Sequence, residues 1–143
     1  MHTNLITILG PTATGKTRLA SRLAQKYNGE IISADSRQVY IGMDIGTGKD
    51  LSDYTVEGEK ISHHLIDIIH PHVEFNLFMF KELFAKSFSD ITSRNKMPFL
   101  VGGTGLYISS IIQNYDLKKA DFNAVRVKEL EILPLDELQN RLI

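Results

Sequence analysis

One stretch of sequence decides the fold of this chain: Gly10-Pro11-Thr12-Ala13-Thr14-Gly15-Lys16-Thr17. It fits the phosphate-loop pattern G-x-x-x-x-G-K-[ST] without a gap and directly follows the apolar run LITIL at residues 5–9. Such a run before a glycine-rich turn is typical of a buried strand that leads into a helix. The sequence therefore predicts a strand over 5–9, a phosphate loop, and a helix from Lys16 to about Tyr27.

The residue types of this loop suit an anionic ligand. Glycines let the backbone curl so that several N–H groups converge on one anion, and the helix N-terminus adds partial positive charge. Lys16 supplies a full charge, and the Thr17 hydroxyl can join the coordination shell of Mg²⁺. A chance glycine-rich turn would lack the flanking strand and helix. We therefore expect a phosphate or diphosphate ligand, with Mg²⁺ as cofactor.

Composition narrows the class of protein. The chain has 143 residues, 43% apolar and 23% charged, which suits a single globular domain. The absence of cysteine excludes disulfides, thiol nucleophiles and Cys-zinc sites. No apolar run approaches the ~20 residues of a membrane span, and no basic segment precedes the first apolar run. We expect a cytoplasmic monomer without membrane contact. With a net charge of −1, the chain as a whole does not attract nucleic acid, so any RNA contact must come from a local patch.

Strand and helix signals alternate along the next part of the chain. Residues 36–60 lack a clear period and read as one long connection, a kind of loop that is often functional. The phenylalanines of the expected second helix fit a buried face better than a base-stacking surface. The elements predicted after the phosphate loop are strands at 30–35, 64–69 and 97–101 and helices at 77–91 and 106–113. This order predicts an α/β fold, a parallel sheet flanked by helices in the manner of P-loop NTPases.

Ligands of parallel sheets bind at the carboxyl ends of the strands. There we expect the phosphate loop to meet Asp35 and the stretch 102–105. Asp35 can hold Mg²⁺ through water or accept a proton from a nucleophile, and the adjacent Arg37 and Gln38 can read a base edge or a phosphate. A capping Asp beside an exposed polar loop is the alternative.

Three further residues invite a functional interpretation. His63 and His64 could suggest a metal site, but neighbouring residues of a strand point to opposite faces. They are better explained as scaffold. Asp67 lies where a second acidic phosphate-site residue could stand, but the apolar run before it is short. It stays unassigned.

Several motifs in series resemble the tRNA dimethylallyltransferases, also called tRNA isopentenyltransferases. The order and spacing agree over residues 4 to about 113, and the match is loose from 114 to 143. Besides the phosphate loop, the resemblance rests on IISADSRQVY at 31–40, GMDIGT at 42–47, HHLID at 63–67 and VGGTGLY at 101–107. It implies transfer of a dimethylallyl group from dimethylallyl diphosphate to N6 of adenosine 37 in tRNA.

The resemblance also assigns roles to residues. It implies that Gly10–Thr17 bind the diphosphate rather than ATP, with Mg²⁺ near Thr17. Lys16, Asp35 and Thr104 would form the catalytic set, with Asp35 accepting a proton from the N6 amine and Thr104 beside the adenine. The residues implied to contact tRNA are Asp35, Ser36, Arg37, Gln38, Thr104 and Arg126.

Family members are much longer than this chain, which resembles a C-terminally truncated form. Residues 116–121 read as a charged linker, and 122–143 as two helical pieces broken at Pro134. We expect a P-loop catalytic core over 1–114 and the incomplete start of a helical tRNA-binding insertion over 115–143. A fragment, a truncated gene product and a reduced family member all remain open explanations.

Other functions share the same loop. A small ATP-binding P-loop kinase of a nucleotide or metabolite would also need an arginine-rich lid, which residues 69–102 lack. An adenylate isopentenyltransferase would act on free AMP, ADP or ATP, but the pair Ser36-Arg37 looks more like the tRNA branch. A non-catalytic diphosphate- or RNA-binding remnant is the third alternative.

Overall fold

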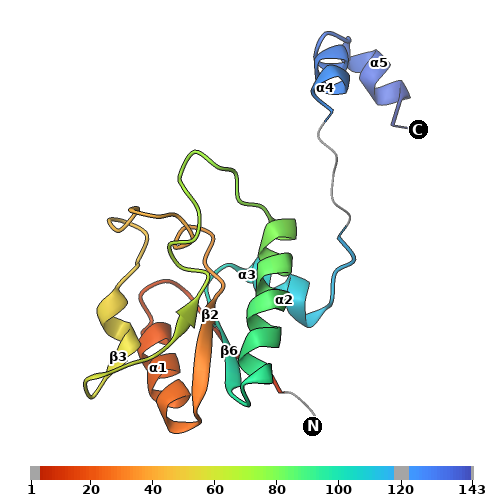
Figure 1. Ribbon diagram of the computed structural model, residues 1–143. Coiled ribbons are helices and arrows are strands. Elements are labelled where there is room, and N and C mark those ends of the chain that lie inside the picture. The colour runs from red at the N-terminus through yellow and green to blue at the C-terminus, as the bar shows by residue number, and fades with distance from the viewer. Residues whose placement is uncertain (1–3, 118–122, 143) are drawn as a thin grey trace.

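A computed structural model describes residues 4–117 and 123–142 (Figure 1). The N-terminal half alternates strands and helices around the phosphate loop, as the sequence predicts. In chain order the elements are β1 (Ile6–Leu9), α1 (Lys16–Lys26), β2 (Gly29–Ser33), the 3₁₀ helix η1 (Leu51–Tyr54), β3 (Thr55–Val56), β4 (Glu59–Lys60), β5 (His63–His64), α2 (Leu77–Ser93), β6 (Met97–Gly102), α3 (Gly105–Ile112), α4 (Ala124–Glu131) and α5 (Leu135–Asn140).

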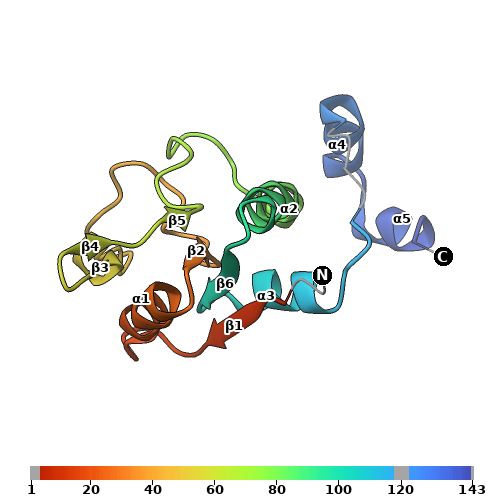
Figure 2. The ribbon, with the colours of Figure 1, turned by 60° about the horizontal axis from the view of Figure 1, so that its bottom comes forward.

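The main sheet is parallel and has the strand order β1-β6-β2-β5. Strand β6 inserts between the first two strands of the chain, so that Phe99 pairs with Ile6 on one side and Ile31 on the other. Figure 2 shows α1 on one side of this sheet and α2 on the other. The predicted parallel sheet flanked by helices is therefore confirmed. The carboxyl ends of β1, β2 and β6 lie together at one edge.

Side-chain alternation along β2 and β6 divides the core in two. Ile31 and Phe99 belong to the cluster under α1, which includes Ala20 and Ala24. Ile32, the next residue of β2, belongs instead to the cluster under α2 and α3. Successive residues of a strand point to opposite faces, so a strand covered on both faces is apolar without interruption. The expected core role of the α2 phenylalanines is confirmed, since Phe80 and Phe84 are buried.

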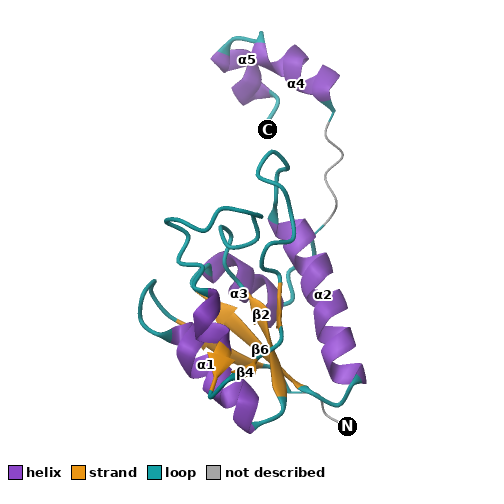
Figure 3. Ribbon diagram, turned by 60° about the vertical axis from the view of Figure 1, so that its left-hand side comes forward, coloured by secondary structure: helices purple, strands orange, loops and turns teal. Residues whose placement is uncertain are grey.

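Two sequence predictions for the middle of the chain are wrong. The strand expected at 64–69 is only His63–His64, because Leu65 and Asp67 adopt left-handed backbone conformations with φ of 63° and 52°. A strand cannot continue through such residues. The connection at 36–60 is also not a plain loop. It contains η1 and the antiparallel hairpin β3-β4, both beside α1 (Figure 3).

The C-terminal helices α4 and α5 differ from the rest of the fold. None of their described residues belongs to either core cluster, and Ile132 and Leu142 are 83% and 87% exposed. The helical pieces and the break at Pro134 are as predicted. Within the described part of the chain, no helix has the length and apolar character needed to cross a membrane.

A candidate active site at the carboxyl ends of the strands

The phosphate loop joins β1 to α1 in a tight turn. Ala13 and Gly15 both have positive φ, and α1 begins at Lys16, directly after the loop. Within the loop, the Thr14 hydroxyl and the Lys16 ammonium both donate to the carbonyl oxygen of Pro11, the former at 2.9 Å. The loop therefore presents an ammonium and a helix N-terminus to the same space, which suits an anion.

A pocket of about 330 Å³ opens above this loop. That size suits a small-molecule ligand. The lining residues come from the phosphate loop, the end of β2 with the connection after it, and the end of β6 with the residue that follows it. The lining residues are Thr12, Ala13, Thr14, Gly15, Lys16, Thr17, Ser33, Asp35, Gln38, Thr47, Gly48, Asp50, Asp53, Tyr54, Val101, Gly102 and Gly103.

The backbones of β2 and β6 approach closely where they reach the pocket. Ala34 N donates to Val101 O at 2.7 Å, and Thr104 N donates to Ala34 O at 3.1 Å. A Cβ added at Gly102 would stand 2.2 Å from Ala34 O, so only glycine fits at this position. This contact fixes the turn that carries Asp35 against the turn that carries Thr104.

Asp35 lies just beyond the end of β2 and is half-buried. Its Oδ1 atom accepts the backbone N–H groups of Arg37, at 2.9 Å, and Gln38, at 3.4 Å. Among the residues that the structure describes, no cationic side chain forms an ion pair with this carboxylate. Local turn bonds therefore orient the carboxylate, and no counter-charge engages it.

Gln38 and Thr104 are tied to the same turn by side-chain bonds. Gln38 accepts the Ser33 hydroxyl at Oε1 and donates from Nε2 to Gly48 O, each at 3.2 Å. Thr104 Oγ1 accepts the N–H of Ser36 at 3.1 Å. Both side chains are consequently held in place beside Asp35.

The structure brings most of the predicted site residues together. Thr12–Thr17, Asp35 and Gln38 line one pocket. Gly10 and Pro11 form the base of the loop, while Ser36 and Thr104 bond to each other next to the pocket. Arg37 is exposed and outside the lining, and Arg126 lies on α4, where it pairs with Glu129 at 3.4 Å. The geometry does not connect Arg126 with the pocket.

The pocket also contains residues that sequence reasoning missed. Thr47, Gly48, Asp50, Asp53 and Tyr54 all come from the connection between β2 and β5. Burial raises the pKa of Tyr54, and its interaction with the Thr17 hydroxyl opposes that rise. The unusual length and polarity of residues 36–60 were the available signal. Only the packing of η1 against α1 shows which of these residues reach the pocket.

The oxygen donors of the pocket fit Mg²⁺. Thr17 offers a hydroxyl, and Asp35, Asp50 and Asp53 offer carboxylates on the same lining. Hydrogen bonds from the Ser52 hydroxyl and N–H lower the pKa of Asp50. Magnesium prefers a few hard oxygen ligands together with water and substrate phosphates. These residues are therefore the ones that could hold the ion.

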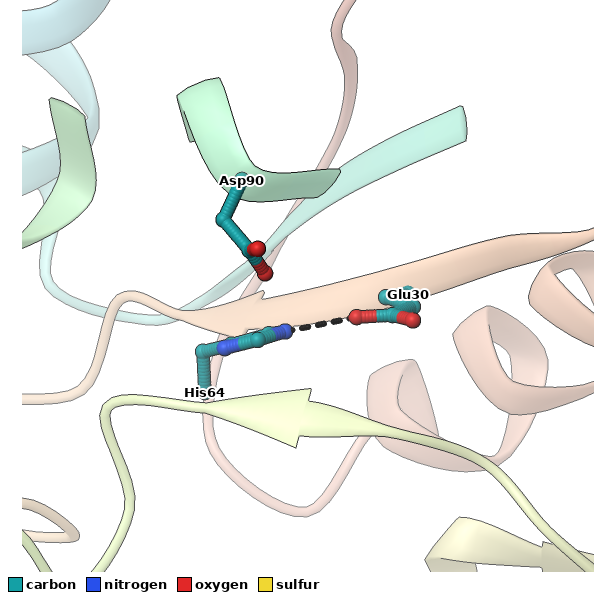
Figure 4. A group of neighbouring side chains, drawn as sticks. All are labelled: Glu30, His64 and Asp90. Carbon is teal, nitrogen blue, oxygen red and sulfur yellow. Dashed lines mark hydrogen bonds and ion pairs between the residues drawn. The ribbon is translucent and has the colours of Figure 1, made fainter. Parts of the chain in front are cut away.

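A second charged group lies at the opposite end of β2, where Glu30, His64 and Asp90 point toward one another (Figure 4). Their ligand atoms lie within 4.8 Å of one another, which alone would suit a metal. However, Arg94 Nη2 donates to both carboxylates, at 2.9 Å to Glu30 and 2.5 Å to Asp90. Lys96 and His64 also contact Glu30, at 2.7 and 2.8 Å. Arg94 and Lys96 therefore supply the positive charge of this cluster.

The two neighbouring histidines do face opposite ways. The ring of His63 packs at a tilt of 38° against Tyr54, with ring centroids 4.3 Å apart, whereas His64 bonds to Glu30. Burial lowers the pKa of His63. These separate partners agree with the expectation that the two side chains point to opposite faces, and their role as scaffold stays a prediction.

Comparisons with known proteins agree with this geometry. The family model described as "IPP transferase" matches residues 38–142, and "Isopentenyl transferase" matches residues 3–64. The chain is 52% identical over 143 residues to tRNA dimethylallyltransferase 1 of Syntrophus aciditrophicus and 53% identical over 142 residues to tRNA dimethylallyltransferase 2 of Syntrophotalea carbinolica. It covers 47% and 46% of those two proteins.

Solved structures show the same likeness. The full-length tRNA isopentenylpyrophosphate transferase of Bacillus halodurans aligns with a TM-score of 0.75 at 40% identity, over 97% of this chain and 46% of that one. A eukaryotic dimethylallyltransferase acting on tRNA aligns with a TM-score of 0.80 at 31% identity, over 98% and 35%. The chain spans about half the length of the curated relatives it matches. By sequence and by fold, it belongs to the IPP transferase family.

Proposed function

We propose that this chain is the catalytic core of a tRNA dimethylallyltransferase, which transfers a dimethylallyl group from dimethylallyl diphosphate to N6 of adenosine 37 in tRNA. One observation carries the proposal. A phosphate loop and a carboxylate that has no cationic partner among the described residues share one pocket. The first suits a leaving diphosphate and the second suits a proton acceptor. A tRNA acceptor would place the reaction in the cytoplasm.

In the proposed step, one bond forms, one bond breaks and one proton is transferred. The N6 nitrogen attacks the allylic carbon, and the carbon–oxygen bond to the diphosphate breaks with its electron pair leaving on oxygen. Backbone N–H groups of the loop and Lys16 stabilise the charge that grows there, which is where electrostatic catalysis is strongest. The proton lost from N6 passes to Asp35. Mg²⁺, when bound through Thr17, Asp50 and Asp53, would neutralise diphosphate charge and leave Asp35 to accept the proton.

The acceptor would approach from the side of the pocket formed by Asp35, Gln38 and the Thr104 turn. Gln38 has both a donor and an acceptor with which to contact an adenine edge, and Ser36 and Arg37 lie between Asp35 and Gln38 in the chain, outside the lining. An adenosine must leave the stack of its loop to reach such a pocket. We propose residues 1–114 as the core and 115–143, with Arg126, as the start of a tRNA-binding part.

The direct test is ligand binding by the purified chain. Isothermal titration should show dimethylallyl diphosphate binding in the presence of Mg²⁺, and Lys16→Ala should weaken it at least about 30-fold, because a charge-assisted contact is lost. Lys26→Ala is the matched control, since Lys26 lies at the far end of the same helix. Tight ATP binding without any binding of the prenyl diphosphate would overturn the proposal in favour of a kinase.

Turnover is tested separately with an anticodon stem-loop that contains adenosine at the target position. Mass spectrometry of the RNA should detect the added prenyl group. Asp35→Asn should slow its formation by about 10²–10⁴-fold, the usual worth of a general base. Diphosphate binding without RNA prenylation would instead favour a non-catalytic role for this chain.

A further inference from the structure

Lys49 has an unusual position for a lysine. Its side chain is only 1% exposed, and its ammonium donates to Tyr40 O at 2.9 Å, Asp44 Oδ1 at 3.0 Å and Asp67 Oδ1 at 2.5 Å. An ammonium has three donors, so the group is fully satisfied. Burial lowers the pKa of Lys49, but the two carboxylates outweigh this effect and raise it. Burying an ammonium is costly unless its charge is paired and its donors are bonded, and both conditions are met here.

The partners of Lys49 come from two separate segments. Tyr40 belongs to the segment after β2 and is joined by a parallel bridge to Ile69. Asp67, which the sequence left unassigned, belongs to the segment after β5. Its own N–H donates to Gln38 O at 3.1 Å, so the backbone of Gln38 is held from this side. Lys49 consequently links the loop 41–50 to both segments.

The same loop reaches the pocket one residue before Lys49. Thr47 and Gly48 line the pocket, and Gly48 O accepts the side-chain amide of Gln38 at 3.2 Å. Gly46 and Gly48 both have positive φ, so the loop is built from conformationally permissive residues. Such a loop needs external contacts to adopt one conformation. Within the loop, Thr47 Oγ1 donates to Met43 O at 2.7 Å. The bond from Lys49 to Tyr40 O connects the loop to a segment outside it.

We propose that Lys49 is a positioning residue for the acceptor side of the pocket. Its ammonium holds the loop 41–50 against Tyr40 and Asp67, and the loop then presents the Gly48 carbonyl that orients the Gln38 amide. The inference deepens the proposed function, because it gives Gln38 one fixed orientation toward the acceptor. In the described part of the chain, the bonds of Lys49 go to Tyr40, Asp44 and Asp67 and none goes to the phosphate loop.

The decisive measurement is nitrogen–proton correlation NMR of the chain, with the Gln38 side-chain amide assigned. In Lys49→Met, which keeps the length of the side chain but removes the donors, the Gln38 signals should move toward the position of a solvent-exposed glutamine. Lys86→Met is the matched control, because Lys86 is exposed on α2 and remote from the loop. Unchanged Gln38 signals in folded Lys49→Met would overturn the proposal. This readout does not depend on either ligand.

A milder variant covers the case in which Lys49→Met does not fold. Asp44 is 67% exposed, so Asp44→Asn removes one carboxylate with little cost to the fold. The Gln38 signals should shift in the same direction by a smaller amount. Unchanged signals in Asp44→Asn, when Lys49→Met is unfolded, would count against a positioning role and assign Lys49 to stability alone.

Binding then separates the two sides of the pocket. Because Asp50 of the same loop is a candidate Mg²⁺ ligand, the diphosphate comparison is made without Mg²⁺. Lys49→Met should then bind dimethylallyl diphosphate within about twofold of the parent chain, while affinity for the anticodon stem-loop falls about tenfold, the worth of one hydrogen bond. Equal weakening of both ligands would contradict the proposal. Failure of the parent chain to bind the diphosphate even with Mg²⁺ would instead contradict the proposed function, and the Gln38 signals would still decide the role of Lys49.

Discussion

Strand β2 carries one carboxylate at its start and another just beyond its end, and the two have opposite surroundings. Glu30 is 2% exposed and contacts Arg94, Lys96 and His64. Asp35 is half-buried and, among the described residues, accepts only backbone N–H groups of its own turn. The bond from Arg94 is the main reason that the pKa of Glu30 lies well below its ordinary value. A fully paired carboxylate stabilises a fold, whereas an oriented but unpaired one is free to react.

The same contrast separates the lysines. Lys49 is buried and all its donors are engaged, whereas Lys16 has as its protein partner only the Pro11 carbonyl of its own loop, within the described part of the chain. Sequence motifs alone do not distinguish these cases, because both lysines follow a glycine. In the described part of the chain, charged groups with several protein partners have structural roles, and those with few partners are the candidate functional groups.

The largest expected effect is on stability, and it comes from a pocket residue that we do not count among the candidate functional groups. Gly102 lies at the pocket end of β6 but has a structural role, because a Cβ there would collide with the Ala34 carbonyl. We expect Gly102→Ala to lower the free energy of unfolding by about 3 kcal/mol, the upper range for overpacking. Urea denaturation followed by circular dichroism measures this.

Gly105→Ala is the control for that change. Gly105 begins α3, and no atom lies within 4 Å of the position its Cβ would occupy. Alanine is the better helix former, so this variant should be neutral or stabilised by up to about 1 kcal/mol. Equal losses in the two variants would refute the close-contact explanation.

Paired isosteric changes test the contrast at the two ends of β2. Glu30→Gln should lower the free energy of unfolding by about 2 kcal/mol, because several bonds to a charged group are weakened at once. Asp35→Asn should change it by less than about 0.5 kcal/mol, because the amide oxygen can still accept the turn N–H groups. Urea unfolding at neutral pH measures both. A larger loss of stability for Asp35→Asn than for Glu30→Gln would contradict the assignment of Glu30 to stability and of Asp35 to reaction.

Acid should remove the contribution of Glu30 to the free energy of unfolding. Its pKa is lowered by folding, so its contribution is fully present above the ordinary value of 4.5 and is lost as the pH falls toward the folded value. The stability difference between the parent chain and Glu30→Gln should therefore shrink by about 1 kcal/mol on acidification below that ordinary value. Denaturation series at several pH values reveal the trend. A difference that grows in acid would contradict the assignment.

The smallest effect concerns a buried polar group that lacks a partner. Ser21 Oγ on α1 is the buried side-chain oxygen that finds no hydrogen bond among the described residues. Ser21→Ala should raise the free energy of unfolding, and by about 0.5 kcal/mol more than Ser89→Ala does, because Ser89 is exposed on α2. Thermal unfolding of the two variants compares them. A loss of stability in Ser21→Ala would show that Ser21 is bonded.

Several parts of the fold were predictable because their causes are local. A β-branched run before a glycine-rich turn predicts a strand, a loop and a helix, and these lie within one residue of their expected bounds. The turn at Asp35 follows from a short apolar strand that ends in polar residues. The third strand was predicted too long, because the left-handed backbone at Leu65 and Asp67 ends it. A pattern of apolar residues gives no sign of such a backbone conformation.

The candidate site divides in the same way. The loop, Asp35 and Gln38 were found because each lies at a strand end with a recognisable motif. Asp50, Asp53 and Tyr54 were missed, because nothing in their own sequence shows that η1 packs beside α1. The Glu30 cluster was missed as well, because Arg94 and Lys96 are distant in the chain and meet Glu30 only through β6.

By itself, the sequence determined the phosphate-loop motif, the strand-and-helix order and the family resemblance, since these depend on neighbouring residues and fixed spacings. Only the tertiary structure decided which charges are paired. Parallel pairing of β2 with β6 and β5 brings Arg94, Lys96 and His64 to Glu30 and leaves Asp35 beside the phosphate loop. A carboxylate's chemistry depends on what surrounds it within a few ångströms, and those neighbours come from distant parts of the chain.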